Sequence, residues 1–136
     1  MSRALSAVLA LALAGTLVAC GSEDSDQLSE GDVRECLAGN GLGAKPPADA
    51  ASRYAPLYLS RAPDFSAYSE DGTQVDVVVQ GAADKAERTA ADVRGAMLPL
   101  GISDADQRVV ASRNVVAVFA ESPSADERKA VSGCLE

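Results

Sequence analysis

Large aromatic side chains are scarce in this sequence, which limits the kinds of core that the chain can build. Only two Phe, three Tyr and no Trp occur among 136 residues, although 47% of the residues are hydrophobic. The core must therefore consist mainly of Ala, Val and Leu, which bury less area per side chain than aromatic residues do. A chain of this length is sufficient for one ordinary domain and too short for two. We expect a single small domain that gains from an additional brace.

The charge balance and the absence of His exclude several classes of function. The formal net charge is −8, and the sequence has no basic cluster of the kind that phosphate binding requires, so we expect no nucleic-acid partner. Without His, the chain lacks the commonest general base and the commonest metal ligand, and we expect no metal and no cofactor. The acidic surface repels anionic lipid head groups, so attachment to a membrane must come from something other than charge.

The N-terminal residues have the order of a signal peptide. Arg3 supplies a positive charge, the apolar stretch Ala4–Val18 follows, and small residues come next. This stretch is shorter than the ~20 residues that a helix needs to cross a bilayer. We therefore expect it to be removed.

The residues Leu17-Val18-Ala19-Cys20 resemble the lipobox of bacterial lipoproteins at all four positions. In that family a diacylglyceryl group is joined to the Cys sulfur as a thioether, and a dedicated peptidase cleaves before the modified residue. The resemblance implies that Cys20 is lipidated, starts the mature chain and holds it on the outer, extracytoplasmic face of the cytoplasmic membrane. The alternative is an ordinary cysteine beside a general signal-peptidase site. The resemblance ends near Gly21 and implies no activity.

These features divide the chain into three parts. Residues 1–19 are the expected signal peptide, residues 20–27 are the lipidated cysteine with an acidic tether, and residues 28–136 form one globular domain. The tether is small, polar and acidic, which is typical of a solvated linker.

Helical and strand patterns alternate along the domain. Ser29 with Asp32, and Ser124 with Glu127, have the spacing of helix N-terminal capping boxes. Ala86, Ala90, Val93 and Met97 recur at helical intervals. The predicted elements are a helix over 30–38, a hairpin of strands over 65–69 and 73–79, a helix over 82–98, strands over 107–111 and 115–120, and a last helix ending near 135.

This order, α-ββ-α-ββ-α, predicts an α+β fold. We expect a two-layer sandwich in which about three helices cover a small, mainly antiparallel sheet of three or four strands. The fourth strand depends on residues 65–69, which could instead form a loop. The long apolar run over 115–120 indicates a central strand.

The Pro-rich segment 44–63 contains the most plausible contact surface. Arg53, Tyr54, Tyr58 and Arg61 lie in it, and Tyr and Arg are enriched at interfaces. The alternative is that the Tyr rings cover the edge of the core while the Arg side chains face water.

The sequence shows no catalytic constellation. Glu70-Asp71 and Glu127 lie at a turn and at a helix start, where acids are common for structural reasons. We therefore expect a non-catalytic interaction or binding module of the cell envelope, whose partner is an envelope protein or a small ligand. The alternative is a small envelope enzyme of unfamiliar type that acts without His or free Cys. A deep pocket with converging carboxylates would favour the enzyme.

The lipoprotein resemblance leaves two cysteines, Cys36 and Cys134, for an oxidising compartment, and we expect them to pair. Each lies in a Val-x-x-Cys-Leu sequence, so Val, Cys and Leu share the apolar stripe of a helix in both places. The bond would tie the first helix to the last. The alternative is two buried free thiols.

Overall fold

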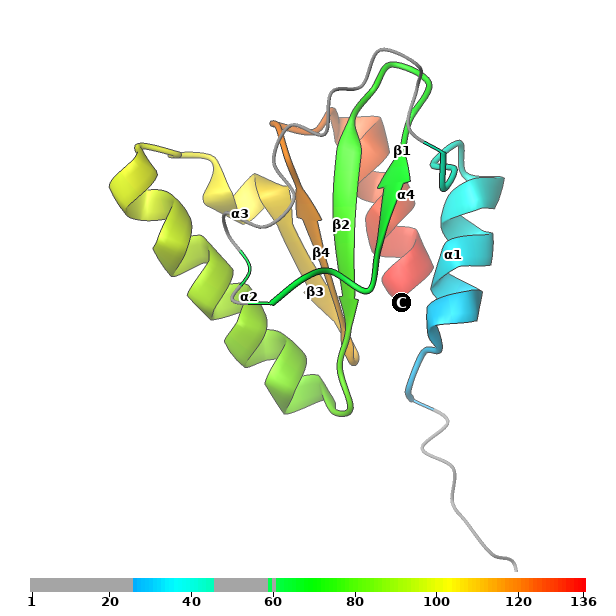
Figure 1. The fold of residues 1–136 in the computed structure, drawn as a ribbon, viewed down its shortest axis with the longest axis horizontal. Coiled ribbons are helices and arrows are strands. Elements are labelled where there is room, and N and C mark those ends of the chain that lie inside the picture. Colours follow the sequence, from blue (N-terminus) through cyan, green and yellow to red (C-terminus); the bar gives the residue numbers. More distant parts are fainter. Residues whose placement is uncertain (1–25, 46–58, 60) are drawn as a thin grey trace, which may run out of the picture.

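Four antiparallel strands form one sheet in the middle of the molecule (Figure 1). The computed structural model describes residues 26–45, 59 and 61–136. The strands are β1 (Phe65–Tyr68), β2 (Gln74–Val79), β3 (Val109–Ser112) and β4 (Val115–Phe119). Their order across the sheet is β1-β2-β4-β3. The strand predicted over 115–120 is therefore central, as expected, and residues 65–68 do form the fourth strand.

The three helices that the sequence predicts are present, and each begins within one residue of its expected start. They are α1 (Glu30–Gly39), α2 (Ala83–Met97), the short α3 (Ala105–Arg108) and α4 (Ala125–Leu135), with a 3-10 turn η1 (Leu98–Leu100) after α2. Both capping boxes are present, at Ser29 and at Ser124. The buried stripe of α2 is the predicted one, Ala86, Ala90, Val93 and Met97. Within the described ranges of the chain, no helix has the length and apolar character that crossing a bilayer requires.

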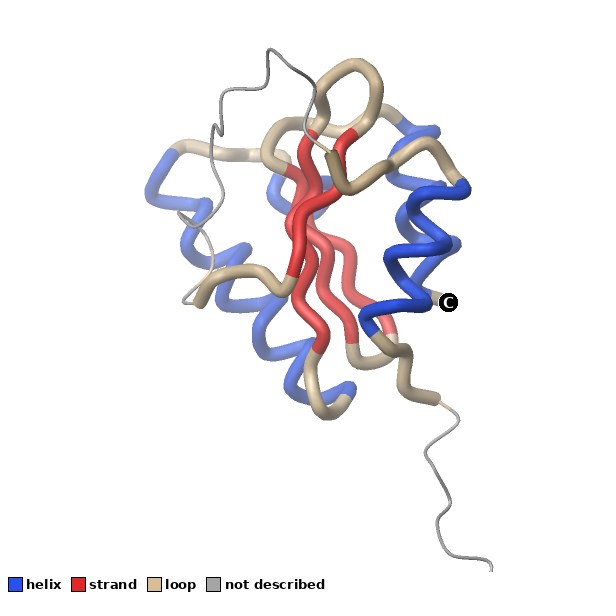
Figure 2. The backbone as a smooth tube through the Cα atoms, turned by 45° about the vertical axis from the view of Figure 1, so that its right-hand side comes forward, coloured by secondary structure: helices blue, strands red, loops and turns tan. Residues whose placement is uncertain are grey.

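Helices cover both faces of the sheet. Val75, Val77 and Phe119 face α1 and α4, whereas Val78 and Val116 face α2. Figure 2 shows the same arrangement, with α2 on one side of the strands and α1 and α4 on the other.

The prediction of two layers is therefore wrong, although the α+β class, the antiparallel sheet and the element order are confirmed. The physical reason lies in the central strands. Val77-Val78-Val79 and the whole of Val115–Phe119 are apolar at consecutive positions, so both faces of the sheet need a cover. Three layers satisfy both faces.

The strand predicted over 107–111 starts two residues late, at Val109. Gln107 and Arg108 belong instead to α3, which the sequence pattern did not indicate. The Arg108 Nε lies 2.9 Å and 3.0 Å from the two carboxylate oxygens of Asp104. The Asp104 carbonyl accepts hydrogen bonds from the backbone N–H groups of Gln107 and Arg108. This i,i+4 ion pair favours a helical turn over an early strand.

Candidate functional site

A groove runs between α1 and β1, with a volume of about 330 Å³. One wall is the α1 face formed by Gly31, Arg34, Glu35 and Ala38. The other wall and the closed end are formed by Leu42, Ala44, Phe65, Ser66 and Ala67. Most of these lining residues are small or apolar, which is typical of binding sites.

The α1 wall is held firmly against the core. Val33 and Leu37 are 0% exposed and pack under the helix. The residues on the groove side, Gly31 and Ala38, have little or no side chain, so the space beside them stays open. The groove is therefore a consequence of small residues on a fixed helix.

Arg34 forms the rim of the groove. Its guanidinium bonds to Glu30, at 2.7 Å from Nε and 2.6 Å from the second nitrogen, and its Cζ lies 4.1 Å from the centroid of the Phe65 ring. The ion pair and the cation–π contact together hold this side chain over the groove.

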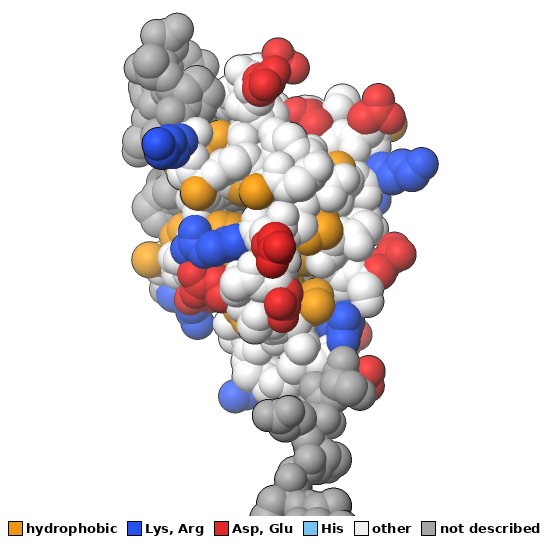
Figure 3. Space-filling model, turned by 90° about the vertical axis from the view of Figure 1, so that its right-hand side faces the viewer, with side chains coloured by type: hydrophobic (Ala, Val, Ile, Leu, Met, Phe, Trp, Pro, Cys, Tyr) orange, Lys and Arg blue, Asp and Glu red, His pale blue; other side chains and the backbone are white. Residues whose placement is uncertain are grey.

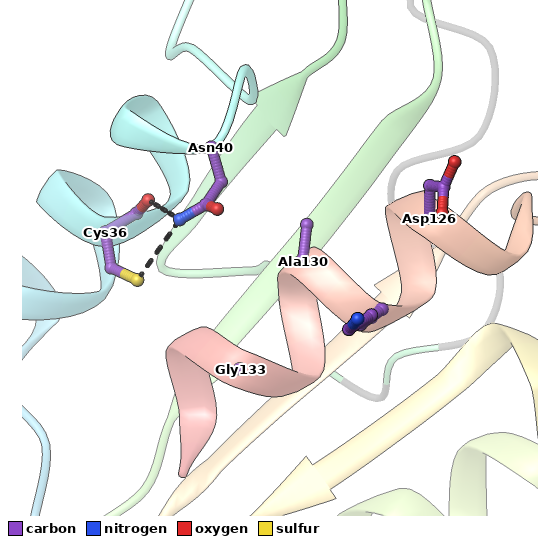
Figure 4. A pocket seen from close by; sticks show the side chains of 6 residues that line it. Cys36, Asn40, Asp126, Ala130 and Gly133 are labelled. Carbon is purple, nitrogen blue, oxygen red and sulfur yellow. Dashed lines mark hydrogen bonds between the residues drawn. The ribbon is translucent and has the colours of Figure 1, made fainter.

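The disulfide between Cys36 and Cys134 joins α1 to α4, with an S–S distance of 2.11 Å and Cα atoms 5.6 Å apart. The pairing expected from the sequence is therefore present. The Asn40 Nδ2 lies 3.6 Å from the Cys36 sulfur and 3.5 Å from the Cys134 sulfur. Figure 4 shows a second cavity, of about 400 Å³, with Cys36 and Asn40 on one wall and α4 on the other.

Most of the sequence-predicted contact surface cannot be placed. Arg53, Tyr54 and Tyr58 lie outside the described residues, as does Cys20. Arg61 is described, and it pairs with Asp64 at 2.6 Å.

Another depression, of about 720 Å³ and distinct from the groove and from the cavity beside Cys36, lies beside the turn between β1 and β2 and the start of α4. Its acidic lining residues are Glu70, Asp71, Asp126 and Glu127. Burial disfavours ionisation of Glu127, but hydrogen bonds from Thr73 and from the backbone and side chain of Ser124 outweigh it and lower the Glu127 pKa. Among the residues that the structure describes, no three His, Cys, Asp or Glu side chains are grouped so as to hold a metal ion.

Sequence reasoning missed one buried carboxyl group. Asp76 lies on the α2 face of β2 and is 3% exposed. Ser66 Oγ donates to it at 2.5 Å and Gln74 Nε2 donates to it at 2.9 Å. Desolvation raises the Asp76 pKa above its ordinary value, although both hydrogen bonds act in the opposite direction. The signal was available, because Asp76 is the one acid in the run Gln74–Val79.

Ionisation of Asp76 should lower the free energy of unfolding of the native protein as the pH rises. We expect Asp76→Asn to abolish this pH-dependent decrease. A raised pKa in the folded state means that the protonated carboxyl stabilises the fold below pH 3.8, and that this contribution is lost as the pH rises through the raised pKa. The amide keeps an oxygen to accept from Ser66 and Gln74. Urea unfolding from pH 3 to pH 7 should therefore show a shallower decline for Asp76→Asn than for the native protein.

The matched control for this pH series is Asp71→Asn at an exposed turn position, whose profile should follow that of the native protein. An Asp76→Asn profile parallel to both would show that Asp76 does not titrate abnormally.

No family model, curated protein or solved structure matches this chain.

Proposed function

We propose that this chain is a lipoprotein of the outer face of the cytoplasmic membrane, and that its domain is a non-catalytic interaction module of the cell envelope. The lipid on Cys20 anchors it, and the domain offers the groove between α1 and β1 to a partner.

One observation carries the anchoring part of this proposal. The chain has three cysteines, and the Cys36–Cys134 disulfide uses two of them. The remaining one, Cys20, ends the lipobox-like Leu17-Val18-Ala19-Cys20 sequence. A disulfide is typical of an oxidising, extracytoplasmic compartment, which agrees with export.

The groove supports the interaction part. Its α1 wall is fixed to the core by Val33 and Leu37 and to α4 by the disulfide, so a partner meets a largely preformed surface. Its lining offers apolar contact from Leu42 and Phe65, and the one hydroxyl in the lining, on Ser66, donates to the buried Asp76 carboxyl.

The acid-lined depression is the feature that most favours an enzyme. Glu127, however, accepts the Ser124 N–H at 2.8 Å in the capping box of α4, and its lowered pKa makes it a poor general acid near neutral pH. Binding therefore remains the proposal. Turnover of any substrate that Glu127→Gln abolishes would favour catalysis instead.

We expect mass spectrometry of the mature protein to find a diacylglyceryl thioether on an N-terminal Cys20. Two acyl chains hold a protein stably on a bilayer, because each buried CH₂ contributes ~0.8 kcal/mol. Cys20→Ser should abolish the modification and move the protein out of the membrane fraction.

The control for the lipidation experiment is Ser22→Ala, two residues beyond Cys20, which should remain membrane-bound. An unmodified Cys20, or a mature N-terminus at another residue, would contradict the anchor. Cross-linking on intact cells, followed by identification of the captured protein, tests the interaction part of the proposal.

A further inference from the structure

The outer edge of β1 offers backbone groups to a further strand. Tyr68 N–H donates to the Gly43 carbonyl at 2.7 Å, and Gly43 N–H donates to the Tyr68 carbonyl at 2.9 Å, on the side of β1 away from β2. Backbone groups of alternate residues in a strand point to the same side. The N–H and C=O of Ser66 therefore point to this outer edge as well, and neither has a backbone partner there among residues 26–45, 59 and 61–136.

Ser66, whose outward backbone groups have no backbone partner among the described residues, lines the groove between α1 and β1. Exposed strand edges are usually covered or blocked, because they pair readily with other chains. Among the α1 residues that line the groove, Gly31 and Ala38 carry no bulky side chain, whereas Arg34 lies over the Phe65 ring at the rim. Backbone hydrogen bonds along an edge and a neighbouring apolar pocket are the two elements of peptide recognition by strand addition.

The surroundings of the groove favour a short segment over a broad protein surface. Figure 3 shows hydrophobic side chains scattered among acidic and basic ones on the side of the molecule where α1 lies, not one continuous apolar patch. A large interface core is depleted in charged residues, whereas a peptide site needs only a local apolar pocket.

The charges on α1 indicate the chemistry of that segment. The helix carries three acidic residues, Glu30, Asp32 and Glu35, and one basic residue, Arg34, which pairs with Glu30 at 2.6 Å. Glu35 lines the groove and makes no ion pair with the described part of the chain. An approaching Lys or Arg would therefore be attracted.

We propose that the groove binds an extended peptide segment of another protein as a strand added to β1, with an apolar side chain in the pocket and a neighbouring Lys or Arg beside Glu35. This inference rests on the proposed function as an interaction module and specifies its partner. The Ser66 N–H and C=O supply one pair of backbone hydrogen bonds, next to the pair that Tyr68 already makes with Gly43.

A displayed library of random heptapeptides, selected on the purified protein, tests this proposal. The enriched peptides should share an apolar residue next to Lys or Arg. Ser66→Pro should weaken their binding about tenfold or more, because Pro lacks the N–H while remaining tolerable at an edge strand. Ser66→Ala isolates the side-chain part of any loss, because it keeps the backbone N–H and removes only the hydroxyl that bonds to Asp76.

A second pair of variants guards against a folding defect in Ser66→Pro. Ala38→Leu fills the groove from an exposed helical position and should also weaken binding at least tenfold, whereas Ala91→Leu at an exposed position of α2 should not.

A library without enriched sequences, or peptides that bind Ser66→Pro and Ala38→Leu as well as the native protein, would overturn the proposal. A dimer that Ser66→Pro dissolves would overturn it in favour of a second copy. None of these outcomes bears on the lipid at Cys20, so failure here and failure of the anchor are distinguishable.

Discussion

Reduction of the Cys36–Cys134 disulfide is expected to lower the melting temperature of the domain more than any other single change. The two cysteines are 98 residues apart in the sequence, and the chain-entropy model assigns about 4–5 kcal/mol to a cross-link that closes a loop of this size. For a domain of this length, that corresponds to a fall on the order of 20 °C. Calorimetry with and without reductant measures it.

The effect should be large because the core offers little to compensate. Of the twelve largest fully buried side chains in the described part of the chain, eight are Val, and only one, Phe119, is aromatic. In the reduced protein, α1 keeps Val33 and Leu37 in the core but loses its covalent link to α4. Amide exchange in α1 should therefore accelerate first.

A double variant, Cys36→Ala with Cys134→Ala, is the matched control for reduction. Its melting temperature should be low, and reductant should not change it further. Two titratable thiols from Cys36 and Cys134 in the denatured, non-reduced native protein would contradict the bridge.

Asn114→Ala should be the most damaging of the polar substitutions, at about 3 kcal/mol of unfolding free energy. Asn114 is 2% exposed at the turn between β3 and β4. Its Oδ1 accepts the Leu28 N–H at 2.7 Å, and its Nδ2 donates at 3.0 Å to the carbonyls of both Leu28 and Gln80. The substitution leaves three backbone groups without their partner.

Equilibrium unfolding in urea measures this loss, and amide exchange at Leu28 should increase with it. Gln27→Ala provides the control, because the Gln27 side chain makes one exposed bond, at 3.0 Å to the Gly81 carbonyl. It should cost less than ~0.5 kcal/mol. Equal midpoints for Asn114→Ala and Gln27→Ala would show that the Asn114 amide does not hold the start of the domain.

The elements that the sequence predicted well are those governed by neighbours three or four residues apart. The capping boxes at Ser29 and Ser124 and the buried stripe of α2 follow from such spacings. The turn at Gly72, where φ is +88°, is equally local. The late start of β3 shows the limit, because the Asp104–Arg108 pair competes with a strand pattern that looks equally good along the chain.

The candidate site was less accessible to sequence reasoning. The predicted contact surface at Arg53, Tyr54 and Tyr58 lies outside the described residues, and the groove arises from Gly31 and Ala38, which have no distinctive chemistry. A space between a helix and a strand depends on which side chains are small where the two approach, and that approach is not encoded in any short pattern.

By itself, the sequence determined the class of the fold, the places where helices begin, the central position of β4 and the pairing partner of each cysteine in the domain. These depend on local spacing, on apolar alternation and on the number of available thiols. Only the tertiary structure decided that α2 takes the opposite face of the sheet from α1 and α4, and that Asp76 and Asn114 are buried among specific donors and acceptors. It also decided that Ser66 lies at the outer edge of β1 without a backbone partner among the described residues. Those outcomes depend on how distant segments share the two apolar faces of β2 and β4, because burial is a property of the packed molecule and not of any residue's neighbours in the chain.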